Sequence, residues 1–277
     1  MFAAALGSGS GGNCYLFEND GTSILVDAGF GTRETRKRLA AIDRSIESIQ
    51  AILLTHEHYD HIRGAARLAA KHQIPVYLTA GTLAASTIDP TTIPVRTFEN
   101  NSSFRLGDFC IHARRTLHDA ADPACFVIEA GDGTRVGLAT DLGHVDQPVI
   151  EHLQQCDALF FESNHDLDML RTGTYPWSLK RRIMSRFGHL SNDDSIGALQ
   201  RLLGAELRSL CMIHLSEKNN HESIVRSMTG AFLERAGVRL DLHIARQDRP
   251  SASMEIARRS VRRSTMRGAP LQQLSLF

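Results

Sequence analysis

Four side chains of the kinds that bind metal ions lie within six residues, directly after a strongly apolar run. The run Ala51–Thr55 is typical of a buried strand, and a helix is expected to begin near Ile62. The string LLTHEHYDH, residues 53–61, connects the two. It contains the four side chains His56, His58, Asp60 and His61.

The spacing of these side chains favours two neighbouring metal positions. Alternate side chains of a strand point to the same face, so His56 and His58 can face one ion. The turn that follows lets Asp60 and His61 face a second position. Imidazole and carboxylate together suit zinc, manganese, iron or a similar divalent ion. The alternative is a solvated polar turn, which three His and one Asp directly after a buried strand disfavour.

Four ligands in one turn cannot close two metal sites, so other parts of the chain should supply more. The candidates are His118 in TLHDA, Asp141 in LATDLGH and His214 in CMIHLS. Each follows a run typical of a strand, so each could lie at a strand end on one rim of a sheet. Taken alone, either His reads as an ordinary polar residue and Asp141 equally well as a helix N-cap. The ordered set favours a metal site more strongly than any member does.

Short β-branched or alternating runs recur along the chain, and several are separated by stretches with helical spacing. The expected strands are Cys14–Glu18, Ser23–Asp27, Ala51–Thr55, Val76–Leu78, Phe109–Arg114, Cys125–Ala130, Val136–Thr140, Ala158–Phe161 and Leu210–His214. The expected helices are Arg33–Ala41, Ile62–Lys71, Asn192–Leu203 and His221–Ala236. This order predicts an α/β fold with mixed sheets and helices packed outside them.

The formal charge of zero is an average over two unlike parts. Of the 31 Lys and Arg, five lie in residues 258–277, which contain no acidic residue. Residues 1–257 therefore hold 26 basic against 31 acidic side chains, a net charge of −5. We expect one domain over residues 1–257, followed by a flexible, disordered basic tail over residues 258–277.

Other features bear on location. No apolar run approaches the ~20 residues that span a bilayer, so no membrane segment is expected. The start, MFAAALGSGSGG, lacks the basic and long apolar regions of a secretory signal. The five cysteines are scattered and form no CxxC pair, which predicts reduced core residues in a cytoplasmic protein. They are Cys14, Cys110, Cys125, Cys156 and Cys211.

Several segments resemble the metallo-β-lactamase fold superfamily over nearly all of residues 1–257 and, within it, the YycJ/WalJ-type nucleases. They are GSGSGGN (7–13), LVDAG (25–29), LTHEHYDHIRG (54–64), TLHDA (116–120), ATDLGH (139–144), FESNHDLDML (161–170), GTYPWSLKRRI (173–183), GHLSN (188–192) and HLSEKNN (214–220). The resemblance implies a four-layer αββα sandwich with a dinuclear site where the two sheets meet. It also implies a phosphodiesterase acting on DNA, described for this group as a 5′-to-3′ exonuclease.

The resemblance also implies roles for individual residues. One divalent ion, zinc or manganese, would be held by His56, His58 and His118. A second would be held by Asp60, His61 and His214, with Asp141 bridging the two. Asp60 would also serve catalysis, since it offsets part of the charge of the ions. Asp27 in LVDAG would support the ligands through hydrogen bonds, whereas from the residues alone it is equally a turn former before Gly29.

Two segments are similar to paired segments of the RNase Z branch, namely GHLS at 188–191 and HLS at 214–216. By that similarity His189 would donate a proton near the scissile phosphate and Glu162 would orient it, with His165 as a further candidate for this network. The alternative is that His189 caps the helix expected near Asn192. The stretch between Asp141 and His214 is too short for a β-CASP insertion, and no flexible arm is evident, which disfavours RNase J and RNase Z.

Three other segments could contact DNA. Basic side chains ahead of His189 could bind phosphates, although a solvated helix face is the alternative. These are Lys180, Arg181, Arg182 and Arg186. Tyr175 and Trp177 could stack on a terminal base, against simple loop packing around Pro176. The loop GSGSGGN could present N–H groups to a phosphate, or could be a tight hairpin turn.

The last five residues resemble the bacterial sliding-clamp-binding motif QL(S/D)LF at every position. They are Gln273, Leu274, Ser275, Leu276 and Phe277. A terminal motif after a flexible basic segment suits docking to a partner, whereas packing against the body is the alternative. The resemblance implies that the chain is tethered to the replication clamp and acts in DNA repair or replication.

The favoured function is thus a dinuclear metal-dependent DNA exonuclease with DNA and the sliding clamp as partners. Same-fold thioesterases, lactonases or RNA-processing nucleases share HxHxDH, because a fold does not fix function. A non-catalytic clamp-associated scaffold with a structural metal is the other alternative. Seven candidate ligands disfavour it, because a structural site needs neither two ions nor an open position.

Overall fold

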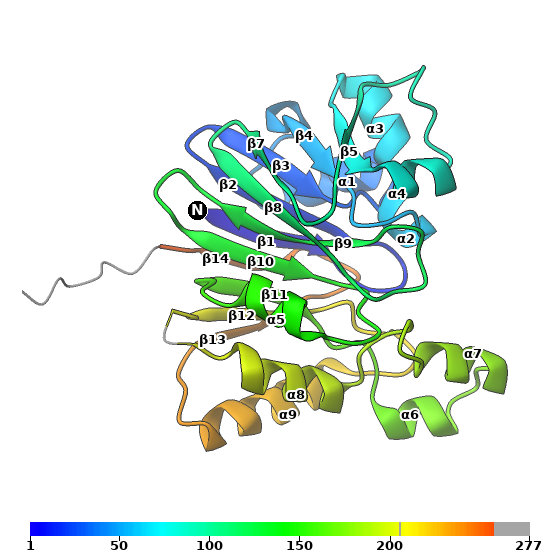
Figure 1. Ribbon diagram of the computed structural model, residues 1–277, viewed down its shortest axis with the longest axis vertical. Helices are drawn as coiled ribbons and strands as arrows, with labels where there is room; N and C mark the ends of the chain where they lie inside the picture. Colours follow the sequence, from blue (N-terminus) through cyan, green and yellow to red (C-terminus); the bar gives the residue numbers. More distant parts are fainter. Residues whose placement is uncertain (205, 258–277) are drawn as a thin grey trace, which may run out of the picture.

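Two seven-stranded sheets pack face to face and carry helices on both outer surfaces (Figure 1). The computed structural model describes residues 1–204 and 206–257. The layers confirm the expected α/β class and the αββα sandwich. The basic tail and the clamp-like motif at 273–277 lie outside the described residues, so the division of the chain at residue 257 stays a prediction.

The first sheet is antiparallel on one side and parallel on the other. Its strands β1, β2 and β3 form an antiparallel meander, and β3 to β6 run parallel. In spatial order the strands are β14 (Ser251–Glu255), β1 (Phe2–Gly7), β2 (Cys14–Asn19), β3 (Thr22–Val26), β4 (Ala51–Leu53), β5 (Val76–Thr79) and β6 (Val95–Phe98).

The second sheet has the same mixed character. Its strands β10 to β13 run parallel, whereas β7 to β10 alternate in direction. In spatial order the strands are β13 (Asp241–Ile244), β12 (Ser209–Ile213), β11 (Ala158–Glu162), β10 (Arg135–Ala139), β9 (Ala124–Glu129), β8 (Phe109–Arg115) and β7 (Ser103–Leu106).

The helices complete the outer layers, and two short ones sit near the strand ends. On the first sheet lie α1 (Thr32–Ala40), α3 (Ala65–His72) and α4 (Ala80–Ala85), with a 3₁₀ turn at Ile46–Ser48. On the second lie α5 (Gln147–Leu153), α8 (Asn192–Leu202) and α9 (Glu222–Arg235). The others are α2 (Tyr59–Ile62), α6 (Leu167–Thr172) and α7 (Trp177–Ile183). No described helix is both long and apolar enough to cross a membrane.

Aromatic side chains fill the layer between the sheets. The ring of Phe160 on β11 meets those of Tyr15 and Phe17 on β2 edge-on, with centroids 5.9 and 5.5 Å apart. All three side chains are fully buried. Edge-to-face contacts of this kind add to the stabilisation from apolar burial alone. The contacts fix one sheet against the other and hence fix the strand ends that both sheets contribute to one edge.

The prediction of one helix over Ile62–Lys71 is wrong about where the helix begins and about its continuity. The helical stretch begins at Tyr59 and is interrupted at Gly64, so that α2 and α3 are separate helices. The Gly64 N–H donates to Ala28 O, and the Asp60 carbonyl, its would-be helical partner, accepts from Asn13 N–H, both at 2.8 Å. A Cβ on Gly64 would lie 1.8 Å from Phe30 O, so only glycine permits this approach. The break fixes the first-turn residues Asp60 and His61 against the strand ends.

Candidate active site

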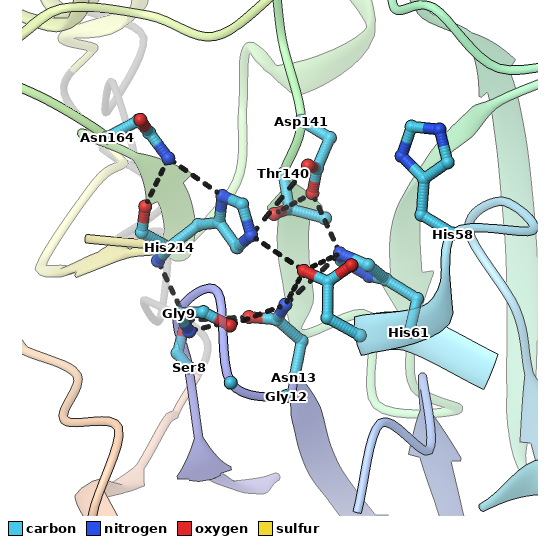
Figure 2. A network of polar contacts seen from close by, with 12 residues as sticks. Ser8, Gly9, Gly12, Asn13, His58, His61, Thr140, Asp141, Asn164 and His214 are labelled. Carbon is cyan, nitrogen blue, oxygen red and sulfur yellow. Dashed lines mark hydrogen bonds and ion pairs between the residues drawn. The ribbon is translucent and has the colours of Figure 1, made fainter. Parts of the chain in front are cut away.

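Parallel strands end together, and the predicted site residues follow those ends. His56 comes after β4, Asp141 after β10 and His214 after β12, while Glu162 is the last residue of β11. Because β3, β4 and β10 to β12 terminate at one edge of the sandwich, side chains far apart in sequence converge there (Figure 2). Loop residues His118 and His189 complete the cluster.

The first group is His56, His58 and His118, whose ligand atoms all lie within 4.8 Å of one another. His118 Nδ1 contacts Gly188 O at 2.9 Å, which fixes this nitrogen as the donor. Its Nε2 therefore faces His58 Nδ1, 3.3 Å away. Thr55 Oγ1 lies 2.9 Å from His56 Nδ1, so His56 Nε2 is left for the interior of the group.

The second group is Asp60, His61 and His214, again within 4.8 Å. Buried Asp27 accepts from His61 Nδ1 at 2.7 Å and from the Thr55 N–H at 2.9 Å. This arrangement turns His61 Nε2 inward, toward Asp60 and Asp141. Asp27 thus hydrogen-bonds to His61 on the side away from Asp60 and Asp141, as a residue that supports a metal ligand would.

Asp141 lies between the two groups. Its Oδ2 is 3.1 Å from His61 Nε2, and its Oδ1 is 3.7 Å from both His118 Nε2 and His214 Nε2. The hydroxyl of Thr140 donates to Oδ2 at 2.7 Å and holds the carboxylate in place. One carboxylate thus reaches members of both groups, as a bridging ligand must.

Three site residues adopt left-handed backbone conformations. Asp27, Asp141 and His214 have φ values of +59°, +56° and +56°. This region is sparsely populated for residues other than glycine and persists where the surrounding structure over-determines it. Each bend occurs directly or almost directly after a strand, so it swings the side chain across the sheet edge rather than along the strand.

Glu162 connects His189 with His214. Its Oε1 lies 2.9 Å from His189 Nδ1 and 3.1 Å from His214 Nδ1. Its Oε2 accepts from the N–H groups of Leu142 and Leu190, at 2.7 and 3.3 Å. Both oxygens of this fully buried carboxylate therefore orient other groups. Its oxygens also lie close enough to Asp141, His189 and His214 for these four residues to share a metal ion.

The charged groups shift the pKa values of the imidazoles in opposite directions. Burial favours neutral His214, but Asp141 and Asp60 outweigh it and raise the pKa of His214 to about 10. Burial would also lower the pKa of His61, but Asp141 and Asp27 hold it well above its usual range. Burial holds the pKa of His56 well below its usual range, so this ring is neutral.

The neighbouring imidazoles lower the pKa values of Asp141 and Glu162. Burial would raise the pKa of Asp141, but His214 and His61 lower it well below the usual range. Burial would likewise raise that of Glu162, yet the neighbouring His189 brings it down to about 2. Without a metal ion, ionised Asp141 and Glu162 are therefore balanced by protonated His61 and His214, while His56 stays neutral.

Sequence reasoning missed several polar side chains that support the cluster (Figure 2). Asn13 Nδ2 contacts His61 Nε2 at 3.1 Å and Asp60 Oδ2 at 3.3 Å. Ser8 Oγ accepts from the His214 N–H at 2.7 Å, and Asn164 Nδ2 donates to the His214 carbonyl at 2.9 Å. The loop GSGSGGN joins antiparallel β1 and β2, and it delivers Ser8 and Asn13 to the site.

The basic residues of α7 and its following loop have different environments. Lys180 is buried, and its ammonium donates to the carbonyls of Arg171 and Gly173 at 2.7 and 2.6 Å. This commits Lys180 to joining α7 with the end of α6 and does not favour its expected contact with phosphate. Arg182 pairs with Asp119, while Arg181 and Arg186 are exposed.

His165 does not hydrogen-bond to Glu162 or His189. Its buried ring has no hydrogen-bond partner at either nitrogen among the described residues. Burial lowers its pKa to about 4, so the ring is neutral at physiological pH. Its backbone instead bridges to Ser191, the residue whose side chain caps α8. The helix cap expected of His189 is therefore supplied by Ser191.

The donor set fits divalent metal ions. His56 Nε2 is buried and has no hydrogen-bond partner within the described ranges 1–204 and 206–257. A buried ring nitrogen is normally paired, and one aimed at two other imidazoles is suited to a cation. Imidazole nitrogens and carboxylate oxygens together are the ligands that zinc and manganese take.

The comparison with known families agrees with this geometry. The sequence profile described as the beta-lactamase superfamily domain matches residues 22–215. The chain therefore belongs to the metallo-β-lactamase fold superfamily, as its motifs predicted. The crystal structure of Zn²⁺-bound PqqB from Methylobacterium extorquens has a TM-score of 0.71 at 19% identity and covers 92% of this chain and 100% of PqqB. That likeness concerns the fold.

Two relatives narrow the class. The chain is 35% identical over 237 residues to the exodeoxyribonuclease YycJ of Bacillus anthracis. The aligned part covers 84% of this chain and 89% of YycJ. It is also 35% identical over 251 residues to the exodeoxyribonuclease WalJ of Streptococcus pneumoniae, covering 86% of this chain and 91% of WalJ. Within the superfamily, the chain is of the YycJ/WalJ type.

Metal binding should displace protons even in mildly alkaline solution, because carboxylates raise the pKa of His214 to about 10. An ordinary imidazole with a pKa of about 6.5 would release almost none at about pH 8. Raising the pH removes the competing protons, so apparent affinity should keep rising between about pH 7 and 9. Calorimetric titration of metal-free protein with Zn²⁺, in buffers of different ionisation enthalpy, counts the protons.

We expect at least one proton per chain at about pH 8. Glu162→Gln removes one of the carboxylates that raise the pKa of His214, so this variant should release fewer. A wild-type titration without proton release, or an affinity that levels off above about pH 7, would contradict the electrostatic account.

Proposed function

We propose that this chain is a metal-dependent exodeoxyribonuclease that hydrolyses DNA from the 5′ end and uses two divalent ions, zinc or manganese. The observation that carries the proposal is the combination of two adjoining ligand groups with a Glu162–His189 pair 2.9 Å apart. The YycJ and WalJ relatives, both named exodeoxyribonucleases, support the substrate class.

The two ligand groups would each hold one ion. His56, His58 and His118 would hold the first, and Asp60, His61 and His214 the second, with Asp141 shared. When bound, such ions activate water and neutralise charge that develops on a phosphate. Asp60 and Asp141 offset part of the ionic charge, so the site keeps enough positive potential to attract an anionic diester.

His189 would act as the general acid. Cleavage of a phosphodiester expels an alkoxide, which needs a proton in the transition state. Glu162 is ionised, with a pKa of about 2, and accepts the Nδ1 proton of His189. The opposite nitrogen, Nε2, can therefore carry the proton toward a substrate. His189 is partly exposed and lines a hollow beside the ligand groups, where a leaving group could reach it.

Exposed cations occur on two parts of the surface although residues 1–257 carry a net charge of −5. Arg181 and Arg186 are exposed on and after α7. Five further cations line a hollow of about 780 Å³ between α1 and α3: Arg33, Arg36, Lys37, Arg67 and Lys71. Such patches attract the phosphate backbone in a salt-dependent way, which supports a nucleic-acid substrate.

The alternatives lack a use for these features. A thioesterase or lactonase of the same fold expels a thiolate or releases an alcohol within a small molecule, and has no need of cations that bind a phosphate backbone. A non-catalytic scaffold would not need the Glu162–His189 pair beside two ligand groups. One measurement, metal-dependent release of nucleotides from DNA, distinguishes a nuclease from both alternatives.

Wild-type protein with Mn²⁺ or Zn²⁺ should release nucleotides from end-labelled single- and double-stranded DNA. His61→Ala removes a metal ligand and should lower the rate by about 100-fold or more on every phosphodiester. His189→Ala should lose about 100- to 10,000-fold on DNA. It should lose little on bis(p-nitrophenyl) phosphate, whose leaving group needs no proton. The assay compares initial rates on the two substrates.

Arg235→Ala, an exposed change on α9, serves as the matched control and should match wild type on both substrates. Absence of metal-dependent nucleotide release from wild type would refute the nuclease proposal. Equal losses of His189→Ala on DNA and on the activated ester would refute the general-acid role alone. DNA hydrolysis that survives His61→Ala would indicate a misassigned metal site.

We also infer that Gln273–Phe277 docks on the bacterial sliding clamp. The sequence QLSLF supports this, since its two Leu and one Phe can fill an apolar pocket while Gln makes polar contacts. Docking would raise the local concentration of the enzyme at replicating or repaired DNA. All five cysteines are free, which supports a reducing, cytoplasmic setting for this work.

Deleting residues 273–277 should weaken binding to purified clamp by about 100-fold or more, because a few buried anchors dominate such interfaces. Leu274→Ala and Phe277→Ala should each account for much of that loss. Gln272→Ala, one residue before the motif, is the control and should bind like wild type. Calorimetry gives the affinities. Equal clamp affinity of the full and truncated chains would contradict the inference.

A further inference from the structure

A small hollow lies between α7 and the loop that carries His189. Its volume is about 160 Å³, smaller than the ~300 Å³ at which most small-molecule pockets begin. Tyr175, Leu179 and Ile183 line one side, and Gly188 and His189 line another. One wall is therefore apolar and aromatic, and the other carries the proposed general acid. A space of this size takes one ring system and excludes a base pair.

The apolar wall is fastened in place. The ammonium of buried Lys180 donates to the carbonyls of Arg171 and Gly173, which joins the middle of α7 to the end of α6. The Asp119 N–H donates to the Phe187 carbonyl at 2.9 Å, and the next carbonyl, of Gly188, accepts from the ligand His118. Both walls are thus held relative to the metal ligands, so the hollow has a defined shape.

Two cationic side chains lie beside the hollow: Arg182 lines it, and Lys218 lies over the ring of Tyr175. The ammonium of Lys218 is 5.5 Å from the centroid of the half-buried Tyr175 ring. Arg182 lines the hollow, pairs with Asp119 and still exposes 59% of its side chain. An aromatic face beside exposed cations is the combination that binds an unpaired base together with its phosphate.

We propose that this hollow is the subsite for the terminal nucleotide at the 5′ end of the strand, with its base unpaired. Tyr175 is the stacking wall, Arg182 contacts the 5′-phosphate, and Lys180 is a positioning residue that holds the wall. The proposal rests on the proposed exonuclease function, including its 5′-to-3′ polarity, and adds a binding site for the nucleotide that is released.

Hydrolysis from the 5′ end, as proposed above, makes the 3′-oxygen of the terminal nucleotide the leaving group. Water forms a new bond to the phosphorus between the first and second nucleotides, and the bond from that phosphorus to the first 3′-oxygen breaks. The 3′-oxygen takes its proton from His189, and the remaining strand keeps the phosphate. Because His189 lines the hollow, the nucleotide that leaves is the one bound there. That nucleotide is at the 5′ terminus and departs with its own 5′-phosphate.

The test uses full-length protein and 5′-phosphorylated oligothymidylates in three forms: complete, abasic at the 5′-terminal nucleotide, and abasic at the 3′-terminal nucleotide. All three carry the same phosphates. Binding is measured by fluorescence anisotropy in EDTA, and release of the first nucleotide is measured separately with Mn²⁺. Loss of the 5′ base should weaken binding by about 5- to 100-fold, the effect of one lost base stack. Loss of the 3′ base should change nothing.

Variants of the stacking wall complete the experiment. Tyr175→Ala should abolish the preference for a 5′ base, and Tyr175→Phe should keep it. Arg235→Ala, an exposed change on α9 that does not line the hollow, is the control and should keep the wild-type preference. Trp177 is the sole tryptophan and lies on α7, so an unchanged emission spectrum in Tyr175→Ala verifies that α7 stays folded.

The outcomes separate the two proposals. A wild-type protein indifferent to the 5′ base, or a preference that survives Tyr175→Ala, would overturn the subsite. Equal sensitivity to the 5′ and 3′ bases would also overturn it. If the 5′-base preference is present in EDTA but no nucleotide is released with Mn²⁺, the subsite stands and the nuclease function fails.

Discussion

The repulsion between carboxylates gathered at one sheet edge is the constraint on which the rest of this structure depends. Asp27, Asp141 and Glu162 are buried, and Asp60 is partly buried beside them. Like charges at such separations coexist in a protein interior only when cations lie between them. The strand ends bring the carboxylates together, and the imidazoles occupy the space between them. Because the charges are balanced in this way, we expect metal ions to replace protons at the site.

Four of the five imidazoles proposed as metal ligands are oriented by a contact on the other ring nitrogen. Thr55 holds His56, Asp27 holds His61, the Gly188 carbonyl holds His118 and Glu162 holds His214. Such bonds fix the tautomer and ring direction of metal ligands. The loop after α7 has a double function, because Gly188 orients a ligand while His189, the next residue, is the proposed proton donor. In the proposed mechanism, metal binding and proton donation would therefore both depend on one short segment, which follows the helix that Lys180 joins to α6.

Much of this arrangement could be predicted from the sequence, for reasons that particular residues make clear. The crowding of His56, His58, Asp60 and His61 after an apolar strand is a strong local signal. Positions after strand-like runs indicated the distant candidates His118, Asp141 and His214, and the resemblance added Glu162 and His189. Asn13, Ser8 and Asn164 gave no such signal, because a lone amide or hydroxyl in a loop has no diagnostic spacing. The strand β1 was missed because FAAALG is rich in alanine, which has low strand propensity. The inward turn of Lys180 and the helix break at Gly64 depend on tertiary hydrogen bonds that no local pattern encodes.

The most direct test of the account is the number of metal ions that the two ligand groups bind. Metal-free protein is equilibrated with Mn²⁺ or Zn²⁺, freed of excess, and measured by native mass spectrometry and elemental analysis. We expect two ions per chain in the wild type. Asp141→Asn should bind fewer than two, because the Asp141 carboxylate reaches both ligand groups. A single ion in the wild type, unchanged by Asp141→Asn, or no bound ion at all, would contradict the account.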